Sequence, residues 1–127
     1  DLQAHNAFVN IDEMHFGNII YNLLDNAVKY SRGDTPIIIT ISTWNDNKDN
    51  LFISIEDNGI GIKKEYIKHI FDKFYRVPTG NRHDIKGFGL GLSYVKKIIQ
   101  LHKGQIKVES EPNIGTKFII ELKTIEI

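Results

Sequence analysis

Apolar residues recur at helical spacing in two stretches of the chain. In the first stretch they follow the i, i+3, i+4 pattern that predicts an amphipathic helix ending near Tyr30. They are Phe16, Ile19, Ile20, Leu23, Leu24, Ala27 and Val28. Asp12 precedes this stretch and is a good N-cap, because its carboxylate accepts from the free N–H groups of the first turn. The second helix follows the glycines at 87, 89 and 91, runs to about His102 and is ended by Gly104.

Shorter β-branched or alternating stretches predict strands around these helices. In chain order they are residues 7–11, 37–44, 51–57, 105–110 and 116–123, and a short helix is expected at 63–74. The second and third strands flank a polar turn and the last two flank a Pro-Asn-Ile-Gly stretch, so each pair predicts a hairpin. This order predicts an α/β (α+β) two-layer sandwich, with helices on one face of a mostly antiparallel sheet. We expect a single domain over residues 1–127.

The composition narrows the class of protein. The 127 residues are 41% hydrophobic, and the 16 Lys and Arg residues balance the 16 Asp and Glu residues. This balance excludes the basic surface of a nucleic-acid-binding protein and a polybasic membrane patch. The chain has no cysteine, which excludes disulfides, zinc-thiolate sites and a cysteine nucleophile. No apolar run approaches the ~18–20 residues of a membrane span, and without an initiator Met or signal peptide the chain is expected to be a soluble piece of a longer protein.

Three asparagines and a lysine share one stripe of the first helix. Asn18, Asn22, Asn26 and Lys29 follow i, i+4, i+8 and i+11 spacing, which places them within about 80° of arc. Asparagine is a weak helix former, at a cost of up to about 0.7 kcal/mol relative to alanine. One interpretation is a solvated polar face, although Glu, Lys and Gln suit such a face better. The other is a site where a neutral amide oxygen binds Mg²⁺ on a polyphosphate and Lys29 faces a phosphate.

Asp57 continues the apolar face of the strand at 51–57, where a carboxylate is costly unless a partner satisfies it. A simple turn is one interpretation, because Asn58-Gly59 is a common hairpin turn. The next segment leads into a helix, however, and not into an alternating strand. Gly59 and Gly61 would let a flat ligand approach the backbone closely. Asp57 would then accept a hydrogen bond from an exocyclic amine, for which adenine is the obvious candidate.

Residues 86–92 read Lys-Gly-Phe-Gly-Leu-Gly-Leu and stand at a junction between a loop and a helix. Exposed backbone N–H groups at such a helix start form a natural phosphate cradle. The G-x-G-x-G spacing fits neither the Rossmann fingerprint nor the Walker A loop, so both common nucleotide folds are disfavoured. A flexible hinge is the alternative explanation.

Together, and in this order, these features resemble the catalytic, ATP-binding domain of sensor histidine kinases of two-component systems. Residues 18–31 (NIIYNLLDNAVKYS) resemble the N box, 57–62 (DNGIGI) the G1 box, 70–76 (IFDKFYR) the F box, 87–92 (GFGLGL) the G2 box, and 115–118 (GTKF) the last small motif. The resemblance extends from about residue 12 to 122. It implies a Bergerat fold, with a mixed, mostly antiparallel sheet of about five strands, three helices on one face, and a mobile ATP lid at about residues 75–88.

The resemblance also implies roles for individual residues. Asn26 would bind Mg²⁺, and Asn22 would lie close to the metal or the phosphates. Asn22 and Arg76 are the expected catalytic residues, with Arg76 reaching toward the γ-phosphate or the partner domain. Asp57 would hold the adenine amine. The remaining expected ATP-binding residues are Lys29, Tyr30, Gly59, Gly61, Ile62, Lys86, Gly87, Gly89, Leu90, Gly91, Leu92 and Thr116.

Two departures from the family pattern stand out. Phe88 occupies a position where the family often carries a small residue such as threonine. The phospho-accepting H box is absent, and the five histidines of the chain share no metal-ligand spacing.

Phe71 and Phe74 of the F box are expected to dock the lid and not to touch the ligand.

The function implied by the resemblance is to bind Mg-ATP and donate its γ-phosphoryl group to a histidine on a separate dimerisation domain. A downstream response regulator is the second implied partner. The chain itself is expected to be a monomeric cytoplasmic domain without direct membrane or nucleic-acid contact, in a membrane-anchored bacterial sensor. Two alternatives stay open. One is a relative of the same fold that hydrolyses ATP to water, with Asp25 as a possible base, and the other is a nucleotide-binding regulatory domain without transfer.

Overall fold

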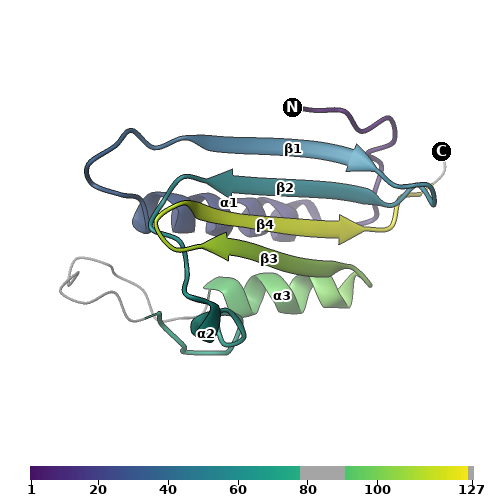
Figure 1. Ribbon diagram of the computed structural model, residues 1–127. Helices are drawn as coiled ribbons and strands as arrows, with labels where there is room; N and C mark the ends of the chain where they lie inside the picture. The colour runs from purple at the N-terminus through teal and green to yellow at the C-terminus, as the bar shows by residue number, and fades with distance from the viewer. Residues whose placement is uncertain (78–90, 126–127) are drawn as a thin grey trace.

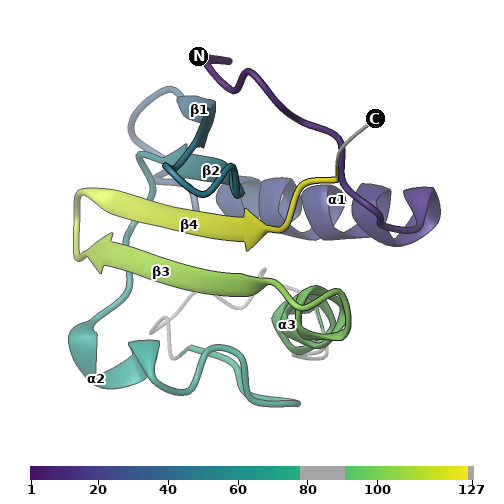
Figure 2. The same ribbon diagram turned by 90° about the vertical axis from the view of Figure 1, so that its right-hand side faces the viewer.

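The computed structural model describes residues 1–77 and 91–125. Within these residues the elements are α1 (Glu13–Lys29), β1 (Ile39–Asn45), β2 (Leu51–Asp57), α2 (Lys64–Ile67), α3 (Gly91–Leu101), β3 (Gln105–Glu111) and β4 (Gly115–Leu122). The strands form one sheet of order β1-β2-β4-β3, and every neighbouring pair is antiparallel (Figure 1). Helices α1 and α3 lie on the same face of this sheet (Figure 2), which confirms the expected two-layer sandwich.

Helix α1 begins and ends where the sequence predicts. The carboxylate of Asp12 accepts hydrogen bonds from the backbone N–H groups of Met14 (2.9 Å) and His15 (3.1 Å), so it caps the first turn. Tyr30 follows the last helical residue. Helix α3 ends at Leu101, before Gly104 as expected, but the left-handed residue that turns the chain is Lys103, with a φ of 60°. The Gly104 N–H then donates to the carbonyl of Ile99 at 2.9 Å.

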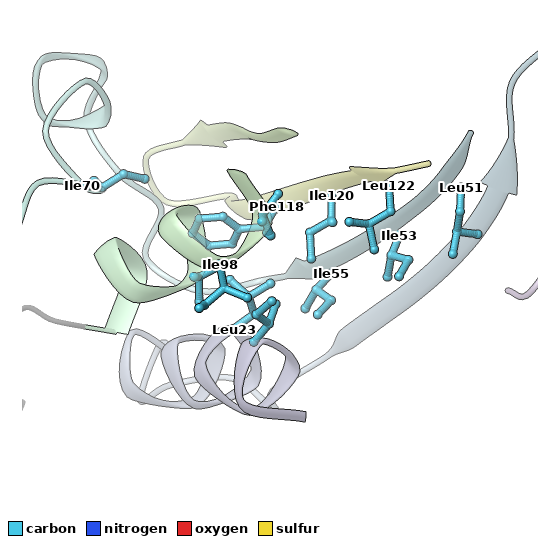
Figure 3. Close-up of a cluster of buried hydrophobic side chains, with 12 residues drawn as sticks. Leu23, Leu51, Ile53, Ile55, Ile70, Ile98, Phe118, Ile120 and Leu122 are labelled. Atoms are coloured by element: carbon cyan, nitrogen blue, oxygen red, sulfur yellow. The ribbon is translucent and has the colours of Figure 1, made fainter. Parts of the chain in front are cut away.

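The core lies between the helices and the central strands. Alternate residues of β2 and β4 point to the helical layer, and facing pairs such as Ile53–Ile120 and Ile55–Phe118 join them across the sheet. Leu23 of α1 and Ile98 of α3 close this layer from the other side (Figure 3). The same face of the sheet continues to Asp57 and Thr116 at one end, where apolar residues give way to polar ones.

Two sequence expectations need correction. The sheet has four strands within the described residues and not about five, because the expected strand at 7–11 makes only an isolated bridge between Val9 and Thr124. The expected helix at 63–74 is helical only over Lys64–Ile67, and the rest consists of turns in which Phe74 adopts a positive φ of 67°. Most of the expected lid, residues 78–88, lies outside the described residues. Over the described ranges, no helix is both long and apolar enough to cross a bilayer.

Candidate functional site

A cavity of about 300 Å³ lies at the end of the sheet where the apolar core face stops. A volume of this size is at the lower end of the range for small-molecule sites. Its walls come from α1, β2, the loop after β2, residues 70–77, the start of α3 and β4. The sequence-predicted residues that line it are Asn22, Asn26, Lys29, Tyr30, Asp57, Gly61, Ile62, Arg76, Gly91, Leu92 and Thr116. Residues from five separate motifs therefore share one cavity.

Only part of the asparagine stripe of α1 reaches the cavity. Asn18 is exposed and is not among the residues lining the cavity, whereas Asn22 and Asn26 are half-buried and do line it. The Asn22 Nδ2 donates to the carbonyl of Asn18 at 2.7 Å, which occupies one donor of its amide. A Cβ added at Gly91 would come within 2.7 Å of the Asn22 Oδ1, so the amide oxygen lies against the first residue of α3.

Lys29 is held by a carboxylate of its own helix. Its Nζ lies 2.9 Å from the Asp25 Oδ2, an i, i+4 pair whose side chains are 35% and 32% exposed respectively. Asp25 lines the cavity beside Lys29. A pair this exposed stabilises the fold only slightly, so the lysine can exchange Asp25 for another anion at little cost.

Asp57, the last residue of β2, brings a carboxylate to the cavity. Its Oδ1 accepts the N–H of Gly59 at 2.8 Å and the N–H of Thr116 at 3.3 Å. Its other oxygen, Oδ2, makes no hydrogen bond to the described part of the chain and is accessible from the cavity. Burial raises the pKa of the Asp57 carboxyl, a rise that the two backbone N–H groups oppose and the nearby charge of Glu56 adds to. The site thus holds a half-buried carboxylate with one oxygen free for a ligand.

The two glycines of the loop after β2 have different surroundings. Gly59 is buried and does not line the cavity; a Cβ there would lie 2.4 Å from the Tyr30 carbonyl oxygen. Gly61 lines the cavity with a φ of 73°, and its Cβ would meet the Glu111 carbonyl at 2.1 Å. Both glycines let the loop pass close to backbone, Gly59 beside the end of α1 and Gly61 beside the β3–β4 turn.

Other residues of the cavity wall are not among the predicted ligand-binding residues. They are Asp25, predicted only as a possible base, and Ile60, Ile70, Tyr75, Val77 and Phe118. Phe118 and Ile70 are core residues, and nothing in their periodicity distinguishes the ones that reach the cavity. Tyr75 and Arg76 come from the F box, and the exposed Arg76 lies on the cavity wall.

Some of the predicted site residues lie outside the residues that the structure describes, and others do not line the cavity. Lys86, Gly87, Gly89 and Leu90 lie outside the described residues. Phe71 does not line the cavity and packs edge-on against Phe118, with ring centroids 6.3 Å apart. The Nδ1 of His102 donates to the Ile98 carbonyl at 2.8 Å, so this histidine has a structural role at the end of α3. In residues 1–77 and 91–125, no three His, Asp or Glu side chains cluster as metal ligands. The oxygen donors on the cavity wall include the amides of Asn22 and Asn26 and the carboxylates of Asp25 and Asp57.

The fold and the cavity define an α/β sandwich domain with a cavity between its helical layer and the end of its sheet. Residues 11–126 match the family described as histidine kinase-, DNA gyrase B-, and HSP90-like ATPase, and the chain belongs to this family.

The chain is similar to named sensor proteins over nearly its whole length. It is 60% identical to the sensor protein RprX of Bacteroides fragilis over 99% of this chain and 24% of that protein. It is 34% identical to the sensor histidine kinase WalK of Bacillus subtilis over 96% of this chain and 20% of that protein. The chain therefore spans about a fifth to a quarter of the length of these curated relatives.

Solved structures share the fold. The mycobacterial sensor histidine kinase MprB matches with a TM-score of 0.80 and 26% identity, over 96% of this chain and 80% of that one. The catalytic domain of the histidine kinase ThkA matches with a TM-score of 0.74 and 28% identity, over 95% of this chain and 76% of that one. The expected Bergerat-type architecture is therefore confirmed.

Proposed function

We propose that this chain is the ATP-binding catalytic domain of a sensor histidine kinase, which donates the γ-phosphoryl group of Mg-ATP to a histidine on a separate dimerisation domain. The observation that carries the proposal is the order of groups along one cavity. Asp57 and Thr116 supply acceptors at one end, and Asn22 lies at the other, against the start of α3. The loop after Asp57 passes beside the end of α1, where a Cβ on Gly59 would meet the Tyr30 carbonyl. Asn22 lies seven residues before Lys29, the last residue of α1, so the two ends are separated by about 10 Å along the helix, a span that suits a base at one end and phosphates at the other.

The base end supports adenine. The free Oδ2 of Asp57 is an acceptor in a half-buried pocket, and the exocyclic amine of adenine is a matching donor. Ile60 and Ile62 supply apolar surface at the same wall of the cavity, as a flat aromatic base requires. Burial that suits an aromatic nucleobase also disfavours the charged form of Asp57, and this burial raises the pKa of its carboxyl.

The phosphate end supports a polyphosphate with its magnesium ion. The donor set fits Mg²⁺, since the ion prefers oxygen ligands and keeps several waters, and amide oxygens add no charge to repel the phosphates. Asn26 would hold the ion, with Asn22 beside it, and Lys29 would turn from Asp25 to a phosphate. When bound, the ion would neutralise charge on the transferring phosphoryl group.

The chain's own residues would contribute positioning and charge. Phosphoryl transfer needs little covalent chemistry from a protein, so orientation of the phosphates and stabilisation of their charge suffice. Lys29 and the exposed Arg76 are the cavity-lining cations on the described residues. The acceptor histidine would come from the dimerisation domain of the parent protein. A response regulator would receive the group next, and the parent would be a membrane-anchored sensor with this domain in the cytoplasm.

The proposal is tested in two stages. Thermal unfolding of the chain with ADP or ATP, each with and without Mg²⁺, should show a stabilisation of about 2.7 kcal/mol at a hundredfold excess over Kd. This corresponds to a rise in Tm of several degrees, which should deepen with Mg²⁺. Labelled ATP is then mixed with the chain and the dimerisation domain of its parent. Acid-labile labelling of that domain supports the kinase, and nucleotide binding without transfer supports a regulatory domain.

Hydrolysis to water is the second candidate, because Asp25 lines the cavity and a carboxylate can act as a base. In the chain without nucleotide Asp25 is paired with Lys29 at 2.9 Å, so it would act as a base only after Lys29 turns to a phosphate. Release of free phosphate by the chain alone, lost in Asp25→Asn, would favour hydrolysis over transfer.

A further inference from the structure

We propose that Ser110, which does not line the cavity, is a positioning residue that makes the base pocket reject 6-oxopurines by fixing the direction of the Thr116 hydroxyl proton. The inference deepens the proposed function and rests on it, since it concerns which purine nucleotide the pocket accepts. Ser110 of β3 and Thr116 of β4 face each other in the antiparallel register. Their hydroxyl oxygens are 2.8 Å apart.

The Ser110 Oγ has three hydrogen-bond partners within residues 1–77 and 91–125. The backbone N–H of Ile62 lies 2.8 Å away, the carbonyl oxygen of Gly115 2.9 Å away, and the Thr116 Oγ1 2.8 Å away. A serine hydroxyl has one proton to donate and two lone pairs to accept with. The Ile62 N–H can only donate, and the Gly115 carbonyl can only accept. Only one assignment satisfies all three contacts: Ser110 donates to Gly115 and accepts from both Ile62 and Thr116.

The Thr116 proton is therefore directed away from the cavity and toward Ser110. The Thr116 Oγ1 presents only lone pairs to a ligand, although its side chain lines the cavity. Asp57 next to it is also an acceptor, because its Oδ1 already binds two backbone N–H groups and its Oδ2 is free. These two neighbouring side chains thus offer acceptors and no donor at the base end.

An acceptor-only pocket treats the two purine classes differently. The 6-amino group of adenine donates and is accepted. The 6-oxo group of hypoxanthine or guanine would place an oxygen against the acceptors, and buried polar groups left unpaired in this way are costly. Without Ser110, the Thr116 hydroxyl could turn its proton to the 6-oxo oxygen. Ser110 therefore acts on the rejection of 6-oxopurines and only slightly on the acceptance of adenine.

The test compares ADP with inosine diphosphate, which differs from it in the 6-oxo group and in the proton on N1. Affinities are measured by titration calorimetry for the unsubstituted chain and for Ser110→Ala, Ser110→Thr and Ser42→Ala. Ser42, a strand serine on β1 that does not line the cavity, serves as the matched control. In Ser110→Ala, we expect the preference for ADP to fall about tenfold, chiefly through tighter binding of inosine diphosphate.

The rescue variant and the control variant show whether Ser110 sets the nucleotide preference or only supports the fold. Ser110→Thr keeps the hydroxyl and should keep the preference, and Ser42→Ala should not change it. An unchanged preference in Ser110→Ala, or equal loss of both nucleotides, would overturn the role of Ser110. If Ser110→Ala does not fold, Ser110→Cys supplies the same test, because a thiol is a weak acceptor and releases the Thr116 proton. If the unsubstituted chain binds neither nucleotide, the proposed function itself fails; if it binds ADP and inosine diphosphate equally, only the role of Ser110 fails.

Discussion

Gly91→Ala separates nucleotide binding from folding more cleanly than a change to any charged residue of the cavity. The new Cβ would lie 2.7 Å from the Asn22 Oδ1, closer than real Cβ contacts, which stay above 3.0 Å. An ordinary contact begins at 3.4 Å, so the amide oxygen has to recede by about 0.7 Å. Asn22 can do so by turning its side chain, which also strains the 2.7 Å bond from its Nδ2 to the Asn18 carbonyl.

The expected effects on stability and on affinity differ in size. The clash is with the end of a flexible side chain and is relieved cheaply, and Gly91 is the first residue of α3, where the helix-interior preference for alanine does not apply. The free energy of unfolding of Gly91→Ala should therefore be nearly unchanged. Loss of one hydrogen bond to a charged ligand costs about 1.5–3 kcal/mol. The affinity for Mg-ATP should fall about tenfold to a hundredfold.

The assay is titration calorimetry with Mg-ATP and, in parallel, with adenosine, which lacks phosphates. Gly17→Ala is the matched control, because Gly17 lies on α1 with no atom within 4 Å of a Cβ built there. Adenosine should bind Gly91→Ala and the unsubstituted chain equally. Full Mg-ATP affinity in Gly91→Ala would refute the assignment of Asn22 to the phosphate end, and an equal loss for adenosine would show that the cavity itself had changed shape.

Three further changes test the metal ligand, the base pocket and the helix start. Asn26→Ala should abolish the Mg²⁺ dependence of ATP affinity in calorimetry, while Asn18→Ala, in the same stripe but outside the cavity, should keep it. Asp57→Asn should weaken ADP binding yet raise the Tm of the ligand-free chain at pH 7. Because burial raises the folded-state pKa of this acid, its charge destabilises the fold above that pKa, and the gain in Tm should vanish below the ordinary aspartate pKa of 3.8 that applies to the unfolded chain; a gain that persists at lower pH would contradict this. Asp12→Ala should lower the stability by about 1 kcal/mol in denaturant melts, with nucleotide affinity unchanged, because it removes the cap of α1.

The helices and hairpins could be predicted because local chemistry and tertiary packing agree in them. Helix α1 has a capping carboxylate and apolar residues at helical spacing, and each hairpin has a polar or glycine-containing turn between two strands. The segment after Ile67 could not be predicted in the same way. Its apolar residues look helical, but Ile70 is drawn into the core while Phe74 is 65% exposed at a positive φ, so packing decides its path.

The cavity residues that could be predicted are those whose residue type is unusual for the helix or strand in which they lie. Asparagines in a helix, an aspartate on an apolar strand face and a glycine pair are each unusual where they stand. Ser110 is an ordinary strand residue, and its importance comes from a contact across the sheet to Thr116 and to the Ile62 backbone. The predicted hairpin would have paired Ser110 with Thr116, but the link to Ile62 depends on how the loop after β2 folds back. The role of Ser110 therefore depends on β3, β4 and the loop after β2 together, and no one of these segments predicts it from its own sequence.

The residues that line the cavity are also the ones that a sequence chosen for stability alone would replace. Asn22 and Asn26 reduce the helix propensity of α1, and Asp57 places a charge where Ile53 and Ile55 continue the core face. Each departure costs stability and each faces the same 300 Å³ of space. Three such unfavourable residues would not be expected to converge on one cavity, so their convergence supports a cavity that binds a ligand, and their amide and carboxylate groups suit an adenine nucleotide with its magnesium ion.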